Sequence, residues 1–156
     1  MLQNGKLATG SIYDNICGGV QLPLEYAWEA ARLAGLDEDI KAMPMGMNTV
    51  VAEGVNTLSG GQRQRIMIAR AVARRPRILL FDEATSALDN RSQAIVSESL
   101  GNLNVTRIII AHRLSTVRQA DRIIVLVDGK VVQTGNYAEL SNTPGTFASF
   151  AQRQLL

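Results

Sequence analysis

Two short apolar runs constrain the fold of this chain more than any other feature of its sequence. Residues 77–81 read Arg-Ile-Leu-Leu-Phe, and residues 106–111 read Thr-Arg-Ile-Ile-Ile-Ala. Runs this short and this apolar are typical of strands that are buried on both faces of a sheet. A helical pattern over residues 91–100 separates them, and strand, helix, strand is the parallel crossover unit. The sequence therefore predicts an α/β fold built on a parallel sheet.

The region upstream of these runs has a helical pattern instead. Residues 24–33 carry apolar side chains at helical spacing, and Gly35 is placed to cap the end of that helix. Asp37 is expected to be the N-cap of a shorter helix, which Pro44 would stop. Together these patterns predict a small helical subdomain over residues 11–57.

The rest of the chain completes the predicted core. A helix should begin at the Gly60-Gly61 pair, continue to about residue 75 and end at Pro76. The dipeptide Asp128-Gly129 is a two-residue hairpin signal, and the antiparallel pair that it joins is expected to close the sheet at its edge. The hairpin strands are expected over residues 122–127 and 130–134, and short helices over residues 136–141 and 146–154.

Composition excludes several classes of protein. The longest apolar runs fall far short of the roughly 18 residues that a membrane span needs, and no basic-then-apolar secretory signal opens the chain. The single cysteine, Cys17, cannot form an internal disulfide and is expected to be an ordinary thiol. Residues 63–77 hold six arginines and no acid, which we interpret as a solvated helix face. No aromatic residues interleave with them, so nucleic acid is not favoured as a partner.

Two acids follow the first predicted strand directly. Asp82 and Glu83 would therefore lie at the carboxyl edge of the parallel sheet, where open α/β sheets bind their ligands. Asp82 is expected to hold Mg²⁺, and Glu83 to orient and deprotonate an attacking water. His112 ends the second strand as Asp82 ends the first, so it should lie at the same rim and donate a hydrogen bond to a terminal phosphate.

The segment Ser59-Gly60-Gly61 precedes a strongly helical stretch. Its two glycines have no side chain that would block close approach to the backbone. The first N–H groups of the helix, the positive end of its dipole and the Ser59 hydroxyl can then face an anion. We expect that anion to be a nucleotide γ-phosphate.

Several motifs in this order resemble the nucleotide-binding domain of an ABC transporter. They are Leu-Ser-Gly-Gly-Gln at residues 58–62, Ile-Leu-Leu-Phe-Asp-Glu at 78–83, Ala-Thr at 84–85, Ser-Ala-Leu-Asp at 86–89 and Ile-Ala-His-Arg-Leu-Ser-Thr at 110–116. The resemblance implies a partial P-loop NTPase-like fold, with ATP and Mg²⁺ as cofactors.

The same resemblance implies a role for individual residues. Ser59, Gly60, Gly61 and Gln62 would be the signature motif, which binds ATP held by the opposite subunit. The resemblance also makes Asp89 part of the D-loop across the dimer interface, His112 the switch histidine, and Gln3 the Q-loop glutamine that links magnesium and nucleotide to the membrane domain. Residues 1–10 would be the Q-loop segment, 11–57 the helical subdomain and 58–156 the signature motif with the C-terminal half of the ATPase core.

One family motif is absent from these residues. The phosphate-binding loop G-x-x-x-x-G-K-[ST] should precede the Q-loop, but Gly5-Lys6 is followed by Leu7, with no earlier glycine at the required spacing. We therefore expect the C-terminal part of an exporter subunit, lacking the Walker A strand and loop and the transmembrane helices. Such a chain should hydrolyse little or no ATP alone.

The partners follow from the resemblance as well. They would be a second nucleotide-binding domain, in a homodimer or a heterodimer, and the transmembrane domain of an exporter at the cytoplasmic face of the plasma membrane. Residues 43–47, Met-Pro-Met-Gly-Met, look most like bacterial bacteriocin and peptide exporters. Two alternatives remain open: a non-catalytic dimerisation or regulatory fragment, and an ABC-type ATPase of DNA repair or translation. The latter would require long heptad arms or a second cassette, and neither is visible.

Overall fold

The computed structural model describes residues 6–52, 58–82, 88–111 and 114–154. The chain divides into two compact units, Met1–Ile109 and Ile110–Leu156. Each unit has its own hydrophobic core, so each is described by itself.

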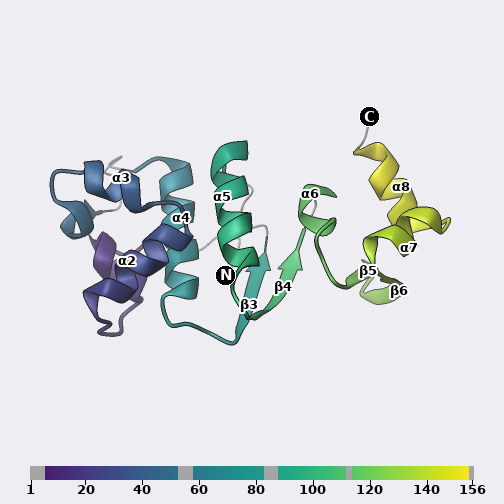
Figure 1. Cartoon of the computed structure of the whole chain (residues 1–156), viewed down its shortest axis with the longest axis horizontal. Helices are drawn as coiled ribbons and strands as arrows, with labels where there is room; N and C mark the ends of the chain where they lie inside the picture. Colours follow the sequence, from purple (N-terminus) through teal and green to yellow (C-terminus); the bar gives the residue numbers. More distant parts are fainter. Residues whose placement is uncertain (1–5, 53–57, 83–87, 112–113, 155–156) are drawn as a thin grey trace. The chain divides into compact units, whose positions relative to one another are not determined.

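The first unit begins with a group of short helices (Figure 1). These elements are β1 (Gly10–Ser11), α1 (Ile12–Cys17), α2 (Leu24–Leu33), α3 (Asp37–Ala42), the 3₁₀ helix η1 (Gly46–Asn48), β2 (Val50–Val51) and α4 (Gly60–Val72). The two-residue strands β1 and β2 pair antiparallel, while α4 packs against α1 and α2. The predicted helical region is therefore present, and its first and last parts are joined by a short strand pair.

Local sequence signals set most of the helix ends. Helix α2 spans the predicted residues, and Gly35 follows it with a left-handed φ of 62°. The prediction for Asp37 is wrong: Leu36 is the N-cap of α3, and Asp37 is the first residue of the helix. The reason is that Leu36 already has helical dihedral angles, and its carbonyl accepts the Ile40 N–H at 3.0 Å. Asp37 instead pairs with Lys41, at 3.6 Å.

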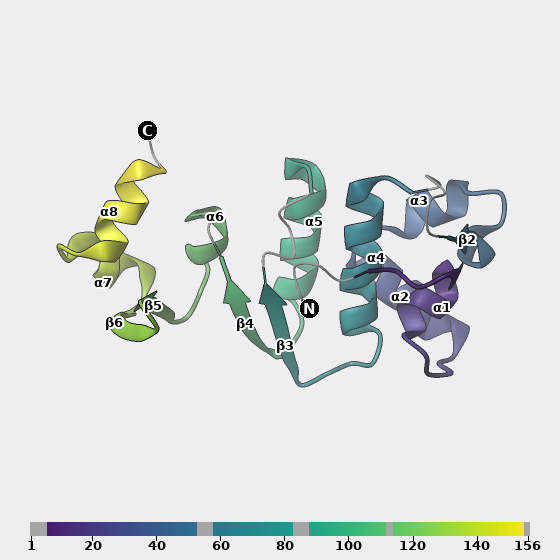
Figure 2. The ribbon, with the colours of Figure 1, turned by 180° about the vertical axis from the view of Figure 1, so that it is seen from behind.

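The crossover unit predicted from the two apolar runs is present. It consists of β3 (Ile78–Asp82), α5 (Asn90–Gly101) and β4 (Thr106–Ile110). The two strands are hydrogen-bonded neighbours, and both point the same way when the unit is seen from the front and from behind (Figures 1 and 2). The α/β class and the parallel sheet are thus confirmed.

Burial of these strands on both faces was predicted, and that prediction is wrong for the described part of the chain. Leu79 and Phe81 are buried and join the core with Val96 and Leu100 of α5. Ile78 and Leu80 alternate with them and are 59% and 58% exposed. All five residues of β4 are exposed as well. Successive side chains of a strand point to opposite faces, so Leu79 and Phe81 lie on the face of β3 that joins the core, and Ile78 and Leu80 lie on the other face.

The second unit contains the predicted hairpin. Its elements are α6 (Leu114–Val117), β5 (Ile123–Val127), β6 (Lys130–Gly135), α7 (Tyr137–Asn142) and α8 (Thr146–Arg153). Asp128 and Gly129 both have positive φ, 49° and 73°, as a type I′ turn requires. Within the second unit, β5 and β6 pair antiparallel as a two-stranded sheet, as predicted for the hairpin. The two-residue turn lets these strands pair locally, which needs no long-range contact.

No helix among the described residues is long and apolar enough to cross a membrane. The longest is α4, with 13 residues.

The core of the first unit depends on the apolar face of α4, which predicts a measurable cost for truncating it. Ile66 is fully buried, so Ile66→Ala should lower the free energy of unfolding by about 2–5 kcal/mol, because the lost methylene groups leave a cavity. Urea denaturation followed by circular dichroism measures the change. Met45→Ala is the control, because Met45 is 58% exposed and its truncation should change the free energy by less than about 0.5 kcal/mol. Equal effects of the two substitutions would contradict this account of the core.

Candidate functional site

The N-terminal end of α4 is closed by a reciprocal pair of hydrogen bonds. Ser59 has extended dihedral angles, and its Oγ accepts the backbone N–H of Gln62 at 3.1 Å. The side-chain Oε1 of Gln62 accepts the backbone N–H of Ser59 in return, at 2.9 Å. This arrangement is a capping box, which fixes where the helix begins. The predicted start of the helix at the glycine pair is therefore confirmed.

Two backbone N–H groups at this end of α4 have no acceptor among the described residues. The first backbone hydrogen bond of the helix runs from the N–H of Arg63 to the Ser59 carbonyl, at 3.0 Å. Within the described part of the chain, the amides of Gly60 and Gly61 have no hydrogen-bond partner. A Cβ built on Gly60 would meet nothing within 4 Å. Open amides at the positive end of a 13-residue helix suit an anion such as a phosphate group.

Asp82 is the last residue of β3 and is partly exposed. The other predicted catalytic and metal-binding residues, Glu83, His112 and Gln3, lie outside the described residues. Across the residues that are described, no three His, Cys, Asp or Glu side chains gather closely enough to hold a metal ion. The assignment of Mg²⁺ to Asp82 and Gln3 thus stays a prediction, as do the roles of Glu83 and His112.

The chain reverses direction between α4 and β3. Helix α4 runs in one direction and β3 returns in the other, in both views (Figures 1 and 2).

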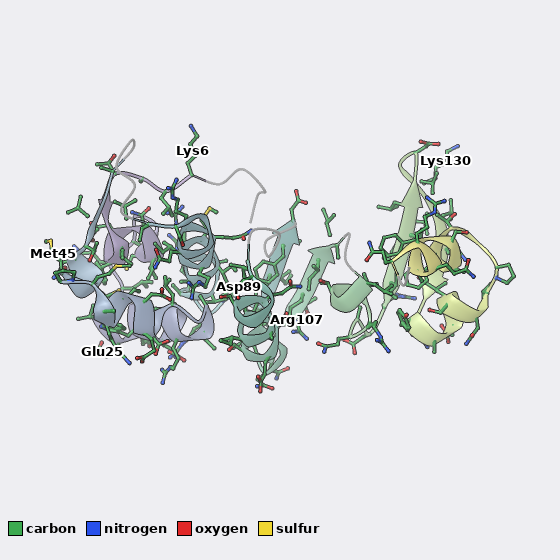
Figure 3. The ribbon with its side chains drawn as sticks, turned by 90° about the horizontal axis from the view of Figure 1, so that it is seen from above. Lys6, Glu25, Met45, Asp89, Arg107 and Lys130 are labelled. Atoms are coloured by element: carbon green, nitrogen blue, oxygen red, sulfur yellow. The ribbon has the colours of Figure 1, made fainter. Side chains whose placement is uncertain are left out.

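Asp89 has a structural task in addition to the one predicted for it. It lies at the beginning of α5, where Figure 3 labels it, and is the N-cap of that helix. Its Oδ1 accepts the Ser92 N–H at 2.9 Å, and its Oδ2 accepts the Ser92 hydroxyl at 2.8 Å. These contacts place an acid at the start of α5, where the helix dipole favours negative charge. Its predicted part in nucleotide binding is not tested by these contacts.

The sequence predicts a solvated face for most of the six arginines, and Arg63, Arg74, Arg75 and Arg77 are indeed exposed, whereas Arg65 and Arg70 are partly buried. The Arg65 side chain is only 12% exposed, and its Nη1 contacts Asp39 Oδ2 at 2.9 Å. Arg63 donates to the Leu58 carbonyl through Nε and Nη2, at 3.2 and 3.0 Å. Arg65 therefore pairs with a carboxylate of the same unit, and Arg63 binds a backbone carbonyl of the same unit.

Arg70 is the centre of a polar network that sequence reasoning missed. Its Nε and Nη2 donate to the carbonyl and the Oδ1 of Asn15, at 2.6 and 2.7 Å. Asn15 is 2% exposed, and it also exchanges two hydrogen bonds with the backbone of Ala8. Burial lowers the pKa of the Arg70 guanidinium. No sequence motif contains both Arg70 and Asn15, because the two residues lie 55 positions apart.

A protein-family model described as "ABC transporter" matches residues 3–86, which is more than half of the chain. The chain belongs to the ABC transporter family. The matched range includes Gln3, the Ser59–Gln62 segment, Asp82 and Glu83, whereas Asp89 and His112 follow it.

Similar proteins come from plants and bacteria. ABC transporter B family member 13 of Arabidopsis thaliana is 53% identical over 97% of this chain, which is 12% of that protein. The alpha-hemolysin translocation ATP-binding protein HlyB of Escherichia coli O157:H7 is 50% identical over 90% of this chain and 20% of that protein. The solved structure of a bacterial Atm1-family ABC exporter with ATP bound matches 99% of this chain and 27% of its own, with a TM-score of 0.93 and 36% identity. The chain thus spans about an eighth to a fifth of the length of these curated ABC transporter relatives.

The capping box predicts a stability effect at the N-terminal end of α4. Ser59→Ala removes the side-chain acceptor for the Gln62 N–H and should cost about 0.5–2 kcal/mol in the free energy of unfolding. The matched control is Ser97→Ala, because Ser97 is exposed in the interior of α5, where alanine is the better helix former. Urea denaturation of both variants measures the difference. A loss at Ser97 as large as that at Ser59 would contradict the capping role.

Proposed function

We propose that this chain supplies the signature motif and part of the hydrolytic site of an ABC exporter's ATPase domain. The observation that supports the proposal most directly is that the amides of Gly60 and Gly61, at the beginning of a capped helix, have no hydrogen-bond partner among the described residues. Asp82, the last residue of β3, adds to the hydrolytic site a carboxylate suited to a divalent cation.

Each site residue then has a chemical task. In the proposal, the amides of Gly60 and Gly61, with the Ser59 hydroxyl, donate hydrogen bonds to the γ-phosphate of an ATP held by the opposite subunit, and the Gln62 side chain keeps that end of the helix closed. The remaining residues act on the ATP that this chain's own subunit holds. Asp82 and Gln3 hold Mg²⁺, which neutralises charge on the phosphates. Glu83 orients and deprotonates the attacking water, and His112 donates a hydrogen bond to the terminal phosphate.

A second nucleotide-binding domain is the proposed partner, together with the transmembrane domain of the exporter. In the family, the signature motif acts on ATP held by the opposite subunit, and Asp89 belongs to the loop that crosses the interface. A Cβ built on Gly60 would meet nothing within 4 Å. This space at the beginning of α4 suits a phosphate carried by another subunit. The proposal covers both a homodimer and a heterodimer. The assembly would work at the cytoplasmic face of the plasma membrane.

The cargo that we propose is a peptide or small protein, such as a bacteriocin. Several relatives are named for translocation of protein toxins, among them a leukotoxin translocation protein of Mannheimia haemolytica that is 46% identical. Residues 43–47 add the likeness to peptide exporters. Other relatives at similar identity carry different names, including a multidrug resistance protein of Entamoeba histolytica at 44%. Peptide-stimulated ATP turnover by the exporter is the measurement that would support a peptide cargo.

ATP turnover tests the proposal. The 156 residues contain no G-x-x-x-x-G-K-[ST] loop, so this chain alone should hydrolyse little ATP, whereas a protein extended upstream through such a loop should hydrolyse it readily. In the extended protein, Glu83→Gln should lower kcat by about 10²- to 10⁴-fold, because the general base is lost. Binding of a fluorescent ATP analogue should persist in this variant, which serves as the control for folding. Rapid hydrolysis by the 156-residue chain, or full turnover by Glu83→Gln, would contradict the proposal.

A further inference from the structure

Asp39 on α3 reaches the capping box of α4 from outside the signature motif. The side-chain Nε2 of Gln62 donates to Asp39 Oδ1 at 2.9 Å, while the Oε1 of the same amide accepts the Ser59 N–H at 2.9 Å. An ionised carboxylate can only accept hydrogen bonds, so Asp39 can face only the NH₂ end of the Gln62 amide. A reversed amide would set two acceptors together at Asp39 and two donors together at Ser59. Asp39 therefore selects the orientation in which the capping box closes.

Arg65 holds the other oxygen of this carboxylate. Its Nη1 lies 2.9 Å from Asp39 Oδ2, and the two side chains are only 12% and 31% exposed. The same nitrogen also donates to the Gly35 carbonyl. Gln62 and Arg65 are three residues apart, so they share one face of α4. With both oxygens engaged by that face, Asp39 cannot turn away from Gln62 without giving up a partly buried ion pair.

We propose that Asp39 is a positioning residue for nucleotide binding at the N-terminal end of α4. It holds the Gln62 amide in the orientation that fixes Ser59, and this keeps the Ser59 hydroxyl and the amides of Gly60 and Gly61 aimed at the phosphate. Ser59 Oγ uses its acceptor on the Gln62 N–H, which leaves the hydroxyl hydrogen to donate to the phosphate. This inference rests on the proposed function, because it assumes that the phosphate binds at this end of the helix.

The first test measures the orientation itself and needs no nucleotide. In the 156-residue chain, Asp39→Ala should speed hydrogen exchange of the Ser59 amide by about three- to tenfold, measured by nuclear magnetic resonance, because the hydrogen bond to Gln62 Oε1 is weakened. Arg65→Ala removes the ion pair that steadies Asp39 but keeps the contact between Asp39 and Gln62, so it should speed Ser59 exchange less than Asp39→Ala does. Lys41→Ala is the matched control on the same short helix, where Lys41 is exposed and pairs with Asp37 and Glu38.

The second test measures the consequence for nucleotide use. In the protein extended upstream through a phosphate-binding loop, Asp39→Ala should lower kcat/KM for ATP by about three- to tenfold, and Lys41→Ala should leave it unchanged. Asp39→Asn retains an amide oxygen that can accept from Gln62 and should restore most of the lost kcat/KM. A role limited to docking α3 on α4 would instead make Arg65→Ala as damaging as Asp39→Ala. The melting temperature of each variant is measured alongside, so that loss of fold is seen separately.

The outcomes separate this inference from the proposed function. Gly60→Asp places a carboxylate where the phosphate would bind and should abolish turnover if the proposed function is correct. If Gly60→Asp abolishes turnover while Asp39→Ala changes neither Ser59 exchange nor kcat/KM, the inference about Asp39 is overturned and the proposed function stands. If Gly60→Asp leaves turnover intact, the proposed function fails. Faster exchange with unchanged kcat/KM also overturns the positioning role.

Discussion

Burial of one face of α4 is the constraint on which the rest of the first unit depends. Ile66, Ile68, Ala69 and Val72 are buried on this helix, and the helices α1 and α2 pack against it. The capping box fixes the residue at which this helix begins. Packing of the apolar face, about two to three turns further along, fixes how the helix lies in the unit. Together they set the position of the Gly60 and Gly61 amides.

The sequence correctly predicts the features that depend on residues close together in the chain. The hairpin turn at Asp128-Gly129, the end of α2 before Gly35 and the capped start of α4 each depend on residues within one or two turns of chain, and the structure has all three. Asp37 was misplaced by one residue, because the chain leaves Gly35 with Leu36 already in a helical conformation. Sequence motifs tell which residues favour a cap, but the entry angle of the chain decides which residue becomes one.

Non-local structure escaped prediction for a different reason. Arg65 and Arg70 look like members of the solvated face that the other four arginines form, because a sequence shows their spacing but not their partners. Asp39 is 26 residues from Arg65, and Asn15 is 55 residues from Arg70, so no periodicity connects either pair. Burial of the strands was overestimated in the same way. The apolar composition of β3 is compatible with burial on both faces of a sheet. Whether Ile78 and Leu80 are buried depends on which elements pack on the sheet, and the sequence of the strand does not show that.

Polar contacts near both ends of α4 explain why a site on this helix can be ready before a ligand arrives. Gln62 and Arg65 are tied to Asp39 near the beginning, and Arg70 is tied to Asn15 near the end. Breaking either set would leave partly buried charged or amide groups without partners, which costs more than the net gain of making one hydrogen bond. A phosphate that binds at Gly60 and Gly61 then meets donors that need no rearrangement, and fixed donors stabilise developing charge more effectively than donors that must first be ordered. The family motif marks where the phosphate would bind, and residues outside the motif keep that position in order.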